Sequence, residues 1–218
     1  MNKKKDIIKI INEISGKYSP YEVFNDWIRC SALTISNSCA LFHDQLWQKR
    51  EDMYIKTMNK YNSEERQKLV ELLGMLWKTF ENYMSDILGE IYMEARMGSK
   101  TTGQFFTPFH LSELCAKLTS IEHDENGIYK VYEPSCGGGG MIIAYAKALK
   151  DKGINYQQCM DVVAQDLDWK GVYMTYIQCS ILGISATVVQ GNTLSELYAA
   201  HYPKDRVLYT PAKMGLLL

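Results

Sequence analysis

The stretch with the clearest chemical potential is a polar and glycine-rich segment between two apolar runs. Residues 133–136 read Glu-Pro-Ser-Cys, and four glycines follow at 137–140. Residues 128–132 predict a buried strand, and residues 141–149 predict a helix. A strand, a glycine turn and a helix together bring backbone N–H groups against a ligand, where a Cβ would obstruct close approach. The segment therefore predicts a ligand-binding turn, and an ordinary glycine-rich surface loop is the alternative.

The spacing excludes two common phosphate-binding signatures. The glycines do not follow G-x-G-x-x-G, and no Lys-Ser or Lys-Thr pair follows them. Glu133, directly before the turn, would repel a phosphate but can accept hydrogen bonds from an ammonium group. These residues favour a cationic, amino-acid-like ligand such as S-adenosylmethionine.

A carboxylate stands where the next strand should end. Residues 159–165 predict a second strand that leads into Asp166. A doubly wound sheet uses a carboxylate at the tip of its second strand to hold a ribose diol, because one anion can accept from two hydroxyl groups. Asp166 is the preferred residue for this role. Asp168 is the alternative, and it can instead cap a helix over residues 169–182.

Two segments resemble a known enzyme family. Residues 133–140 resemble the D-P-x-C-G-[ST]-G-G motif of adenine-N6 DNA methyltransferases, most closely that of the modification (M) subunits of type I restriction systems. Upstream, residues 103–108 (Gly-Gln-Phe-Phe-Thr-Pro) resemble the G-[QE]-[FY]-[FY]-T-P segment of the same family. Both segments occur in the family's order and at roughly its spacing. The resemblance covers residues 86–194 well and the rest of the chain poorly.

The resemblance implies an S-adenosylmethionine-dependent, adenine-specific DNA methyltransferase with a recognisable cofactor site. Residues 105–107 would line the methionine end of the cofactor, and Leu167 would pack against its adenine. Asn192 would read the adenine amino group through its side-chain carbonyl. The cofactor-binding residues implied are Phe105, Phe106, Thr107, Pro108, Glu133, Pro134, Ser135, Cys136, Gly137, Gly139, Asp166, Leu167 and Asn192.

The resemblance fails at the loop that should hold the target base. Family members flip the adenine out of the duplex and bind its amino group with an [ND]-P-P-[FYW] loop after the fourth strand. Here the expected fourth strand, residues 206–209, is followed by Thr210, Pro211, Ala212 and Lys213. Three of these four residues depart from the motif, so no catalytic residue is assigned and the activity of this chain alone is in doubt. A degenerate gene, a truncated fragment and a protein that does not methylate would each explain the loop.

Two other functions stay open on the sequence. A non-catalytic S-adenosylmethionine-binding or interaction protein derived from this family would keep the cofactor motifs and lack the target-base loop. A small-molecule or protein methyltransferase would share the fold, since fold alone does not fix the substrate. The two DNA-methyltransferase-like segments argue against this last function.

The elements that must position these residues fall into two parts. The expected fold class is α/β, with an N-terminal helical bundle over residues 1–100. A truncated Rossmann-like S-adenosylmethionine-dependent methyltransferase domain follows over residues 101–218 and ends after its fourth strand. Thr107 is expected to cap a helix over 109–118, with Pro108 at its first position. Apolar spacing predicts helices over about 5–15, 20–36, 39–59, a helix capped by Ser63, and one from about 86.

Composition limits the partners. The formal net charge of −1 is not that of a protein that grips DNA over its whole surface, so any basic patch must be local or come from another subunit. DNA and specificity or restriction subunits are the partners that the resemblance implies. The exposed edge of a sheet cut after its fourth strand also invites homo-oligomerisation.

Cysteine usage and hydropathy fit a cytoplasmic protein. The six cysteines include no C-x-x-C pair, which favours free thiols in a reducing compartment over a zinc site or disulfides. Cys39 and His43 lie one helical turn apart but have no further ligand nearby, so no metal site is expected. No apolar run reaches membrane-spanning length, and no membrane partner or signal peptide is expected.

Overall fold

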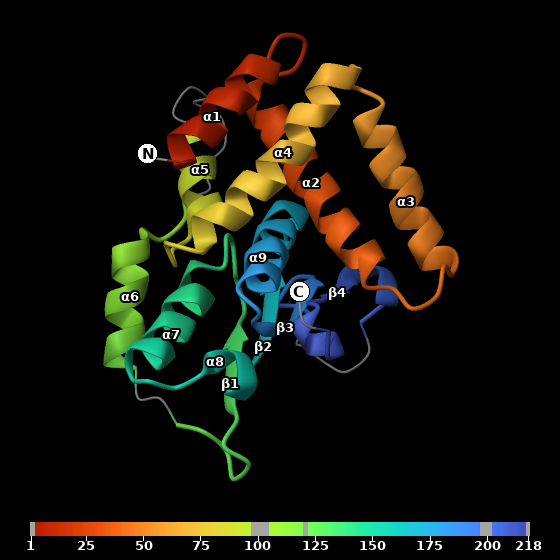
Figure 1. Ribbon diagram of the computed structural model, residues 1–218. Helices are drawn as coiled ribbons and strands as arrows, with labels where there is room; N and C mark the ends of the chain where they lie inside the picture. Colours follow the sequence, from red (N-terminus) through yellow and green to blue (C-terminus); the bar gives the residue numbers. More distant parts are fainter. Residues whose placement is uncertain (1–2, 97–104, 120–121, 197–201, 217–218) are drawn as a thin grey trace.

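The computed structural model describes residues 3–96, 105–119, 122–196 and 202–216, and combines a helical part with a four-stranded sheet (Figure 1). The helical part confirms the five helices predicted from apolar spacing. Its elements are α1 (Lys3–Ile14), α2 (Pro20–Ser38), α3 (Gln45–Met58), α4 (Ser63–Phe80) and α5 (Ile87–Arg96).

Capping residues correct two of the predicted helix starts. Helix α3 begins at Gln45 rather than near residue 39, because the Asp44 side chain caps it by accepting from the Trp47 N–H at 2.8 Å. Helix α4 is capped by Asn62 and not by Ser63. The Asn62 side chain accepts from the Glu65 N–H, and the Glu65 carboxylate accepts from the Asn62 N–H at 2.8 Å. This reciprocal pair satisfies two backbone donors that the helix itself leaves open.

The second part of the chain is an α/β unit. Its sheet has the order β1-β2-β3-β4, in which the first three strands are parallel and β4 is antiparallel to β3. Val162 pairs with Val131 on one side and with Ala186 on the other, which fixes the register. The elements are α6 (Phe109–Leu118), β1 (Tyr129–Glu133), α7 (Gly140–Asp151), α8 (Tyr156–Cys159), β2 (Met160–Asp166), α9 (Trp169–Ile181), β3 (Ser185–Gln190) and β4 (Val207–Tyr209).

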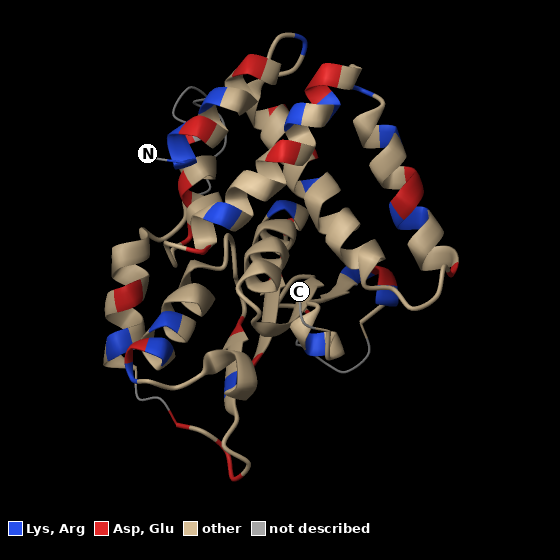
Figure 2. Ribbon diagram, in the orientation of Figure 1, with Lys and Arg blue, Asp and Glu red and all other residues tan. Residues whose placement is uncertain are grey.

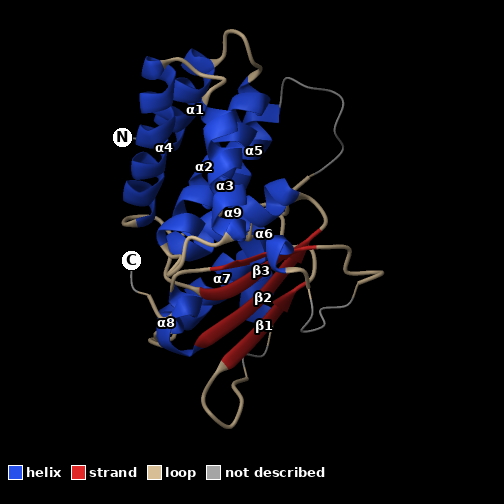
Figure 3. Cartoon of the chain, turned by 90° about the vertical axis from the view of Figure 1, so that its right-hand side faces the viewer, coloured by secondary structure: helices blue, strands red, loops and turns tan. Residues whose placement is uncertain are grey.

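Helices cover one face of the sheet among the described residues. The connections β1–α7–β2 and β2–α9–β3 run in the same direction, and right-handed crossovers then place both helices on the same side. Figure 3 shows this layer of helices beside the strands. On the helix side Val162 and Val188 are fully buried, whereas Tyr132 and Tyr209 on the other side are 47% and 50% exposed.

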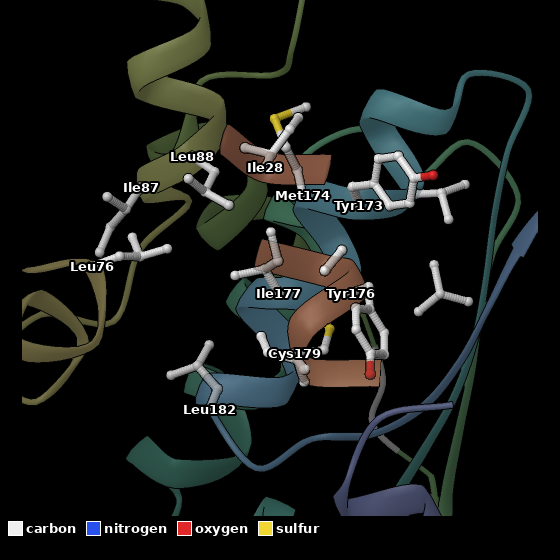
Figure 4. Close-up of a cluster of buried hydrophobic side chains, with 14 of the residues drawn as sticks. Ile28, Leu76, Ile87, Leu88, Tyr173, Met174, Tyr176, Ile177, Cys179 and Leu182 are labelled. Atoms are coloured by element: carbon white, nitrogen blue, oxygen red, sulfur yellow. The ribbon is translucent and has the colours of Figure 1, made fainter. Parts of the chain in front are cut away.

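Helix α9 joins the two parts of the chain. All residues from 171 to 180 are buried, because α9 lies between the sheet and helices α2 and α5. Figure 4 shows Met174 and Ile177 of α9 clustered with Ile28 of α2 and Leu88 of α5. One hydrophobic core therefore runs from the bundle to the sheet. The predicted boundary between residues 100 and 101 lies outside the described residues, and the division into two domains stays a prediction.

Among the described helices, none combines the length and apolar character that a membrane crossing requires.

Candidate functional site

The carboxyl ends of β1, β2 and β3 meet at one edge of the sheet, and a cavity of about 460 Å³ opens there. The loops after these strands supply most of its lining, which is where open α/β sheets bind ligands. Ten of the thirteen predicted cofactor residues line it: Phe105, Phe106, Thr107, Pro134, Ser135, Cys136, Gly137, Asp166, Leu167 and Asn192. Pro108, Glu133 and Gly139 do not.

The glycine turn owes its shape to tight surroundings. Gly137 and Gly139 have positive φ angles of 51° and 90°, which side-chain-bearing residues rarely adopt. A Cβ on Gly137 would also lie 2.8 Å from the Phe106 ring. The Cys136 N–H donates to the Gln165 carbonyl at 2.9 Å and so fastens the turn to β2. Helix α7 begins directly after the turn and points its N-terminus at the cavity edge.

Asp86 is a cavity residue that the sequence analysis missed. It precedes α5 in the helical part, is 4% exposed, and lines the cavity beside the glycine turn. Its Oδ1 accepts from the Gly89 N–H at 2.9 Å and from Gln178 Nε2 at 2.8 Å. No described residue donates a hydrogen bond to Oδ2. Burial raises the pKa of the Asp86 carboxyl, and the Gln178 hydrogen bond opposes this shift.

Gln178 of α9 links Asp86 to the turn. Its side-chain nitrogen donates both to Asp86 and to the Gly138 carbonyl, and its side-chain oxygen accepts from the Leu88 N–H at 3.1 Å. The residue is completely buried, so these bonds satisfy a polar group that would otherwise be costly. Only the fold brings these three segments together, since residues 86 and 178 are far apart in the sequence. No local sequence signal marks either residue.

Asp166 and Asp168 divide the two roles that the sequence left open. Asp166 lines the cavity, and its two oxygens accept from the Gly137 and Asp168 N–H groups, each at 2.8 Å. Asp168 is the N-cap of α9, where its side chain accepts from the Lys170 N–H at 3.0 Å. The capping interpretation of Asp168 is confirmed. Asp166 keeps the position at the tip of β2 and also braces the glycine turn.

The segment at 105–108 forms one side of the cavity but does not cap a helix. Phe106 packs against Tyr92 of α5 with 4.9 Å between ring centroids, while Phe105 is 80% exposed. Helix α6 begins at Phe109 with Pro108 as its N-cap, and no side chain caps it. The prediction that Thr107 is the N-cap is therefore wrong, because its side chain makes no hydrogen bond to the first turn.

Ser112 of α6 adds an unsatisfied polar atom to the cavity wall. Its side chain is completely buried, and its Oγ has no hydrogen-bond partner among the described residues. Ser112 lines the cavity together with Met141 at the start of α7. A buried hydroxyl without a partner is uncommon in proteins.

The loop after β3 closes the cavity from the other side. Asn192 lines it, and the side-chain oxygen of Asn192 accepts from the Leu194 N–H at 3.0 Å. Thr193 donates from Oγ1 to the Pro134 carbonyl at 2.6 Å, which ties this loop to the glycine turn. The two loops are thus held in a fixed relation before any ligand binds.

Two predicted residues lie behind the cavity rather than in its wall. Glu133 ends β1, and its Oε1 accepts from the Ser135 N–H at 3.2 Å. Burial raises the pKa of Glu133, and the nearby Asp166 charge contributes to the same shift. Gly139 packs against Thr175 of α9. Both residues support the turn from outside the cavity.

The segment Thr210–Lys213 lies at the opposite edge of the sheet. Because β4 is antiparallel, its carboxyl end meets the amino ends of β2 and β3. Thr210 Oγ1 donates to the Ile184 carbonyl at 2.8 Å, and Lys213 Nζ pairs with Asp161 at 2.7 Å. Asp161 and the cavity residue Asp166 are five residues apart on one strand, which is about 17 Å. The structure therefore does not bring Thr210, Pro211, Ala212 or Lys213 to the cavity.

The charges around the cavity suit a cationic ligand. Asp86 and Asp166 line it, and no lysine or arginine occurs among the described residues of its wall. Burial raises the pKa of the Cys136 thiol well above its usual value, which disfavours the reactive thiolate form. Among the described residues no cluster of three metal-ligating side chains occurs, and His43 stacks on Trp47 with 4.0 Å between ring centroids.

Comparison with known sequences identifies a family and a relative that match part of this chain. The sequence model of the family described as N-6 DNA Methylase matches residues 83–210. The methylase subunit of the type I restriction enzyme MpnII from Mycoplasma pneumoniae is 34% identical over 92 residues. That stretch covers 38% of this chain and 17% of the subunit, so the chain spans a minor part of its relative's length.

Comparison with solved structures gives the fold. A protein from Listeria monocytogenes, described as a class I S-adenosylmethionine-dependent methyltransferase, superposes with a TM-score of 0.52 at 13% identity. The superposition covers 90% of this chain and 55% of the Listeria protein. A type I restriction-modification methyltransferase subunit from Streptococcus thermophilus gives a TM-score of 0.45 at 17% identity, covering 88% of this chain and 44% of that one. The first superposition shows that the Rossmann-like fold expected from the sequence is the fold of this chain.

Proposed function

This chain belongs to the N-6 DNA methylase family, and from this premise we propose that it binds S-adenosylmethionine in the cavity at the carboxyl edge of its sheet. The proposed reaction, at the level of the family, is methylation of the N6 amino group of adenine in DNA. Type I methylase subunits are the model for its assembly, with a specificity or restriction subunit as partner.

The observation that carries this proposal is the lining of the cavity. It combines a glycine turn, two carboxylates, an unpartnered buried hydroxyl on Ser112, and no positive side chain among its described residues. S-adenosylmethionine carries a sulfonium, an ammonium, a carboxylate and a ribose diol. When bound, it supplies an electrophilic methyl group. A nucleotide phosphate would instead meet the negative charges of Asp86 and Asp166.

Four parts of the cofactor have a candidate partner in the wall. Asp166 is placed to accept from the ribose hydroxyls, and Asp86 can accept from the ammonium group through Oδ2. The N-terminus of α7 offers a partial positive charge to the cofactor carboxylate. Leu167 and Asn192 are proposed for the adenine ring.

A second candidate function is cofactor binding without methyl transfer. The observation that favours it is the position of Thr210–Lys213, which holds the amino ends of β2 and β3 together and does not reach the cavity. Methyl transfer, the first candidate function, would instead require acceptors for the amino protons of the target adenine. We propose that residues outside the described cavity wall, or another chain, supply them.

Calorimetric titration with S-adenosylmethionine and S-adenosylhomocysteine tests the shared part of both functions. We expect saturable binding of both compounds with a stoichiometry of one. Binding of neither would overturn the cofactor assignment. Transfer of a labelled methyl group to unmethylated DNA, with alternating dG–dC duplex as the adenine-free control, then separates the two candidates. Label in the adenine-containing DNA alone supports methylation, and no label despite cofactor binding supports the second candidate.

A further inference from the structure

A second cleft, of about 590 Å³, lies between α3 and the β4 edge of the sheet, beside the start of α9. Among its described lining residues Asp205 is the single acidic side chain. The basic residues that line it are Arg29, Lys49, Arg50, Lys56, Lys60 and Arg206. Because the whole chain has a net charge of −1, this basic lining is a local concentration of positive charge. Figure 2 shows the Lys and Arg residues of α3, in blue, on the same side of the molecule as the segment Lys204–Arg206 that precedes β4.

Part of this positive charge is neutralised within the fold. Asp26, which is 4% exposed, pairs with Arg29 at 3.2 Å and with Lys60 at 2.9 Å. Asp205 pairs with Lys49 at 2.9 Å across the cleft. Only the exposed Lys49–Asp205 pair crosses the cleft, since Asp26, Arg29 and Lys60 all belong to the helical part.

The remaining cations are only partly compensated. Arg50 is half-buried, forms no ion pair among the described residues, and donates to the Val207 carbonyl at 3.3 Å. Burial lowers the pKa of the Arg50 guanidinium, and nearby Tyr176 and Asp44 oppose this shift. Lys56 is exposed and likewise has no ion pair among the described residues. Arg206 pairs with Glu196 at 3.1 Å, and both side chains are about two-fifths exposed.

The arrangement of the cleft fits an extended polyanion. Lys49 and Lys56 are seven residues apart in the sequence, so they stand on one face of α3 about 10 Å apart along its axis. The half-buried ring of Trp169 stacks at 5.1 Å on the buried ring of Tyr173 and forms an apolar wall. Nucleic-acid sites combine such cations, which contact phosphates, with aromatic rings that contact sugars and bases.

The cleft is also next to the proposed cofactor cavity. Leu167 of the β2–α9 loop lines the cofactor cavity, and Trp169, two residues later, lines the basic cleft. We propose that the basic cleft binds the phosphate backbone of DNA and so positions the duplex beside the cofactor. This inference rests on the proposed function for the identity of the polyanion, but not for the existence of the cleft.

Two matched triple variants test the proposal. The cleft triple is Lys49→Gln, Lys56→Gln and Arg206→Gln. The control triple, Lys117→Gln, Lys150→Gln and Lys152→Gln, removes three exposed lysines near the carboxyl ends of α6 and α7, on the other side of the molecule. Both triples remove the same charge. Binding of a fluorescein-labelled duplex is measured by anisotropy between 50 and 200 mM salt, values that span the range over which phosphate contacts weaken by orders of magnitude.

For the cleft triple we expect DNA binding that is at least about tenfold weaker. The slope of log K against log salt concentration should be smaller by about two to three, since each lost phosphate contact removes about 0.9 from this slope. The control triple should remain within about twofold of the unmodified protein. Equal loss in both triples, no loss in the cleft triple, or no DNA binding by the unmodified protein at low salt would overturn the proposal.

Two further measurements separate the remaining outcomes. Melting temperatures of both triples should match that of the unmodified protein, and a second cleft variant, Lys56→Gln alone, keeps the test valid if the triple unfolds. Poly-glutamate of matched charge replaces DNA in a parallel titration. Binding of poly-glutamate but not of DNA would overturn the proposal in favour of an acidic protein partner. Calorimetry with S-adenosylmethionine reports on the proposed function separately, because the substituted residues do not line the cofactor cavity.

Discussion

The two carboxylates of the candidate cofactor cavity come from different parts of the chain. Asp166 stands at the tip of β2, whereas Asp86 precedes α5 and reaches the cavity from the helical part. Gln178 connects them indirectly. Its side chain donates to Asp86 and to the Gly138 carbonyl, and Asp166 accepts from the N–H of the adjacent Gly137. Each acid therefore braces the glycine turn as well as facing the cavity, and substitutions at either should be judged by both stability and affinity.

Replacing Asp166 tests the ribose assignment. Asp166→Ala should weaken S-adenosylmethionine binding by at least about 1 kcal/mol, because hydrogen bonds to a charged group are lost. Calorimetry measures the affinity, and thermal melting reports the loss of the bonds to Gly137 and Asp168. The matched control is Asp168→Ala, which removes the cap of α9 and should lower stability by about 1 kcal/mol with little effect on affinity. Unchanged affinity in Asp166→Ala would contradict the assignment.

Replacing Asp86 tests the ammonium assignment and gives it a pH dependence. Asp86→Asn should weaken S-adenosylmethionine binding by about 1.5 kcal/mol, or roughly tenfold. Methylthioadenosine, which lacks the amino-acid end of the cofactor, should bind both proteins equally. If both compounds lose affinity to the same extent, Asp86 acts only through the shape of the turn.

The sign of the pH effect follows from burial. Burial raises the pKa of Asp86 above its usual 3.8, so on acidification its charge is lost at a higher pH than for an exposed carboxyl. Only the charged form attracts an ammonium group. Cofactor affinity should therefore rise with pH through this raised pKa, and the rise should be smaller in Asp86→Asn. Calorimetry over an acidic pH series measures it, and identical profiles for the two proteins would argue against the assignment.

At the scale of elements, the glycine turn shows why glycine occupies positions 137–139. Positive φ angles account for Gly137 and Gly139. Gly138 has no such angle, but a Cβ there would lie 2.7 Å from Asp86 Oδ1. The turn is thus pressed against a side chain from the helical part, and the requirement at Gly138 is one of space.

A pair of alanine substitutions separates the effect of space from that of chain flexibility. Gly138→Ala should destabilise the protein by about 1–3 kcal/mol, because the added methyl group collides with Asp86. Gly74→Ala, at an exposed position inside α4 with nothing within 4 Å of the added Cβ, should instead stabilise it by about 1 kcal/mol. Urea denaturation measures both changes. A neutral Gly138→Ala would mean that Asp86 moves aside without cost.

The direction of β4 determines which contacts Thr210, directly after this strand, can make. Thr210 is completely buried, and its hydroxyl bridges the backbone of β3 by accepting from the Ala186 N–H at 2.9 Å. Its surroundings explain a hydroxyl residue at this position without any part in catalysis. The Thr210 hydroxyl thus has a structural role in this fold, and the interpretation of Thr210–Lys213 as an altered target-base motif stays a prediction.

At the scale of the whole molecule, one core connects the helical part to the sheet. The buried cluster extends from Ile7 in α1 through Trp27 and Leu76 to Val162 and Val188 in the sheet. Helix α9 contributes to both parts, so neither can expose its face of α9 without loss of apolar burial. The helical part is thereby a structural support of the candidate cofactor cavity.

A shared core predicts cooperative unfolding. Calorimetric heating should give one transition with equal calorimetric and van't Hoff enthalpies. Leu76→Ala, at a completely buried position in α4, should lower the free energy of unfolding by about 2–5 kcal/mol and move that single transition to a lower temperature. Two resolved transitions, with only one of them moved by the substitution, would support two independent domains divided near residue 100.

Much of this fold follows from local pattern. Helical spacing of apolar residues marked the five helices of the bundle, and strand–turn–helix order marked β1, α7, β2, α9 and β3 to within a few residues. Errors fell on helix starts, where a neighbouring side chain supplies the cap, as Asn62 does for α4, and on the short helix α8, which was not predicted. The cavity wall was found largely because the motif residues follow strand ends, whose positions a parallel sheet brings together.

The sequence by itself determined which short segments line the candidate cofactor cavity, because glycines, a carboxylate at a strand tip and their spacing are local properties of the chain. Only the tertiary structure decided that Asp86 and Gln178 belong to the same site, since their contact joins segments about ninety residues apart through the packing of α5 on α9. The tertiary structure also decided where Thr210–Lys213 lies. The direction of β4 is set by pairing with β3, which no local pattern records, and this pairing carries the segment to the edge of the sheet opposite the cavity.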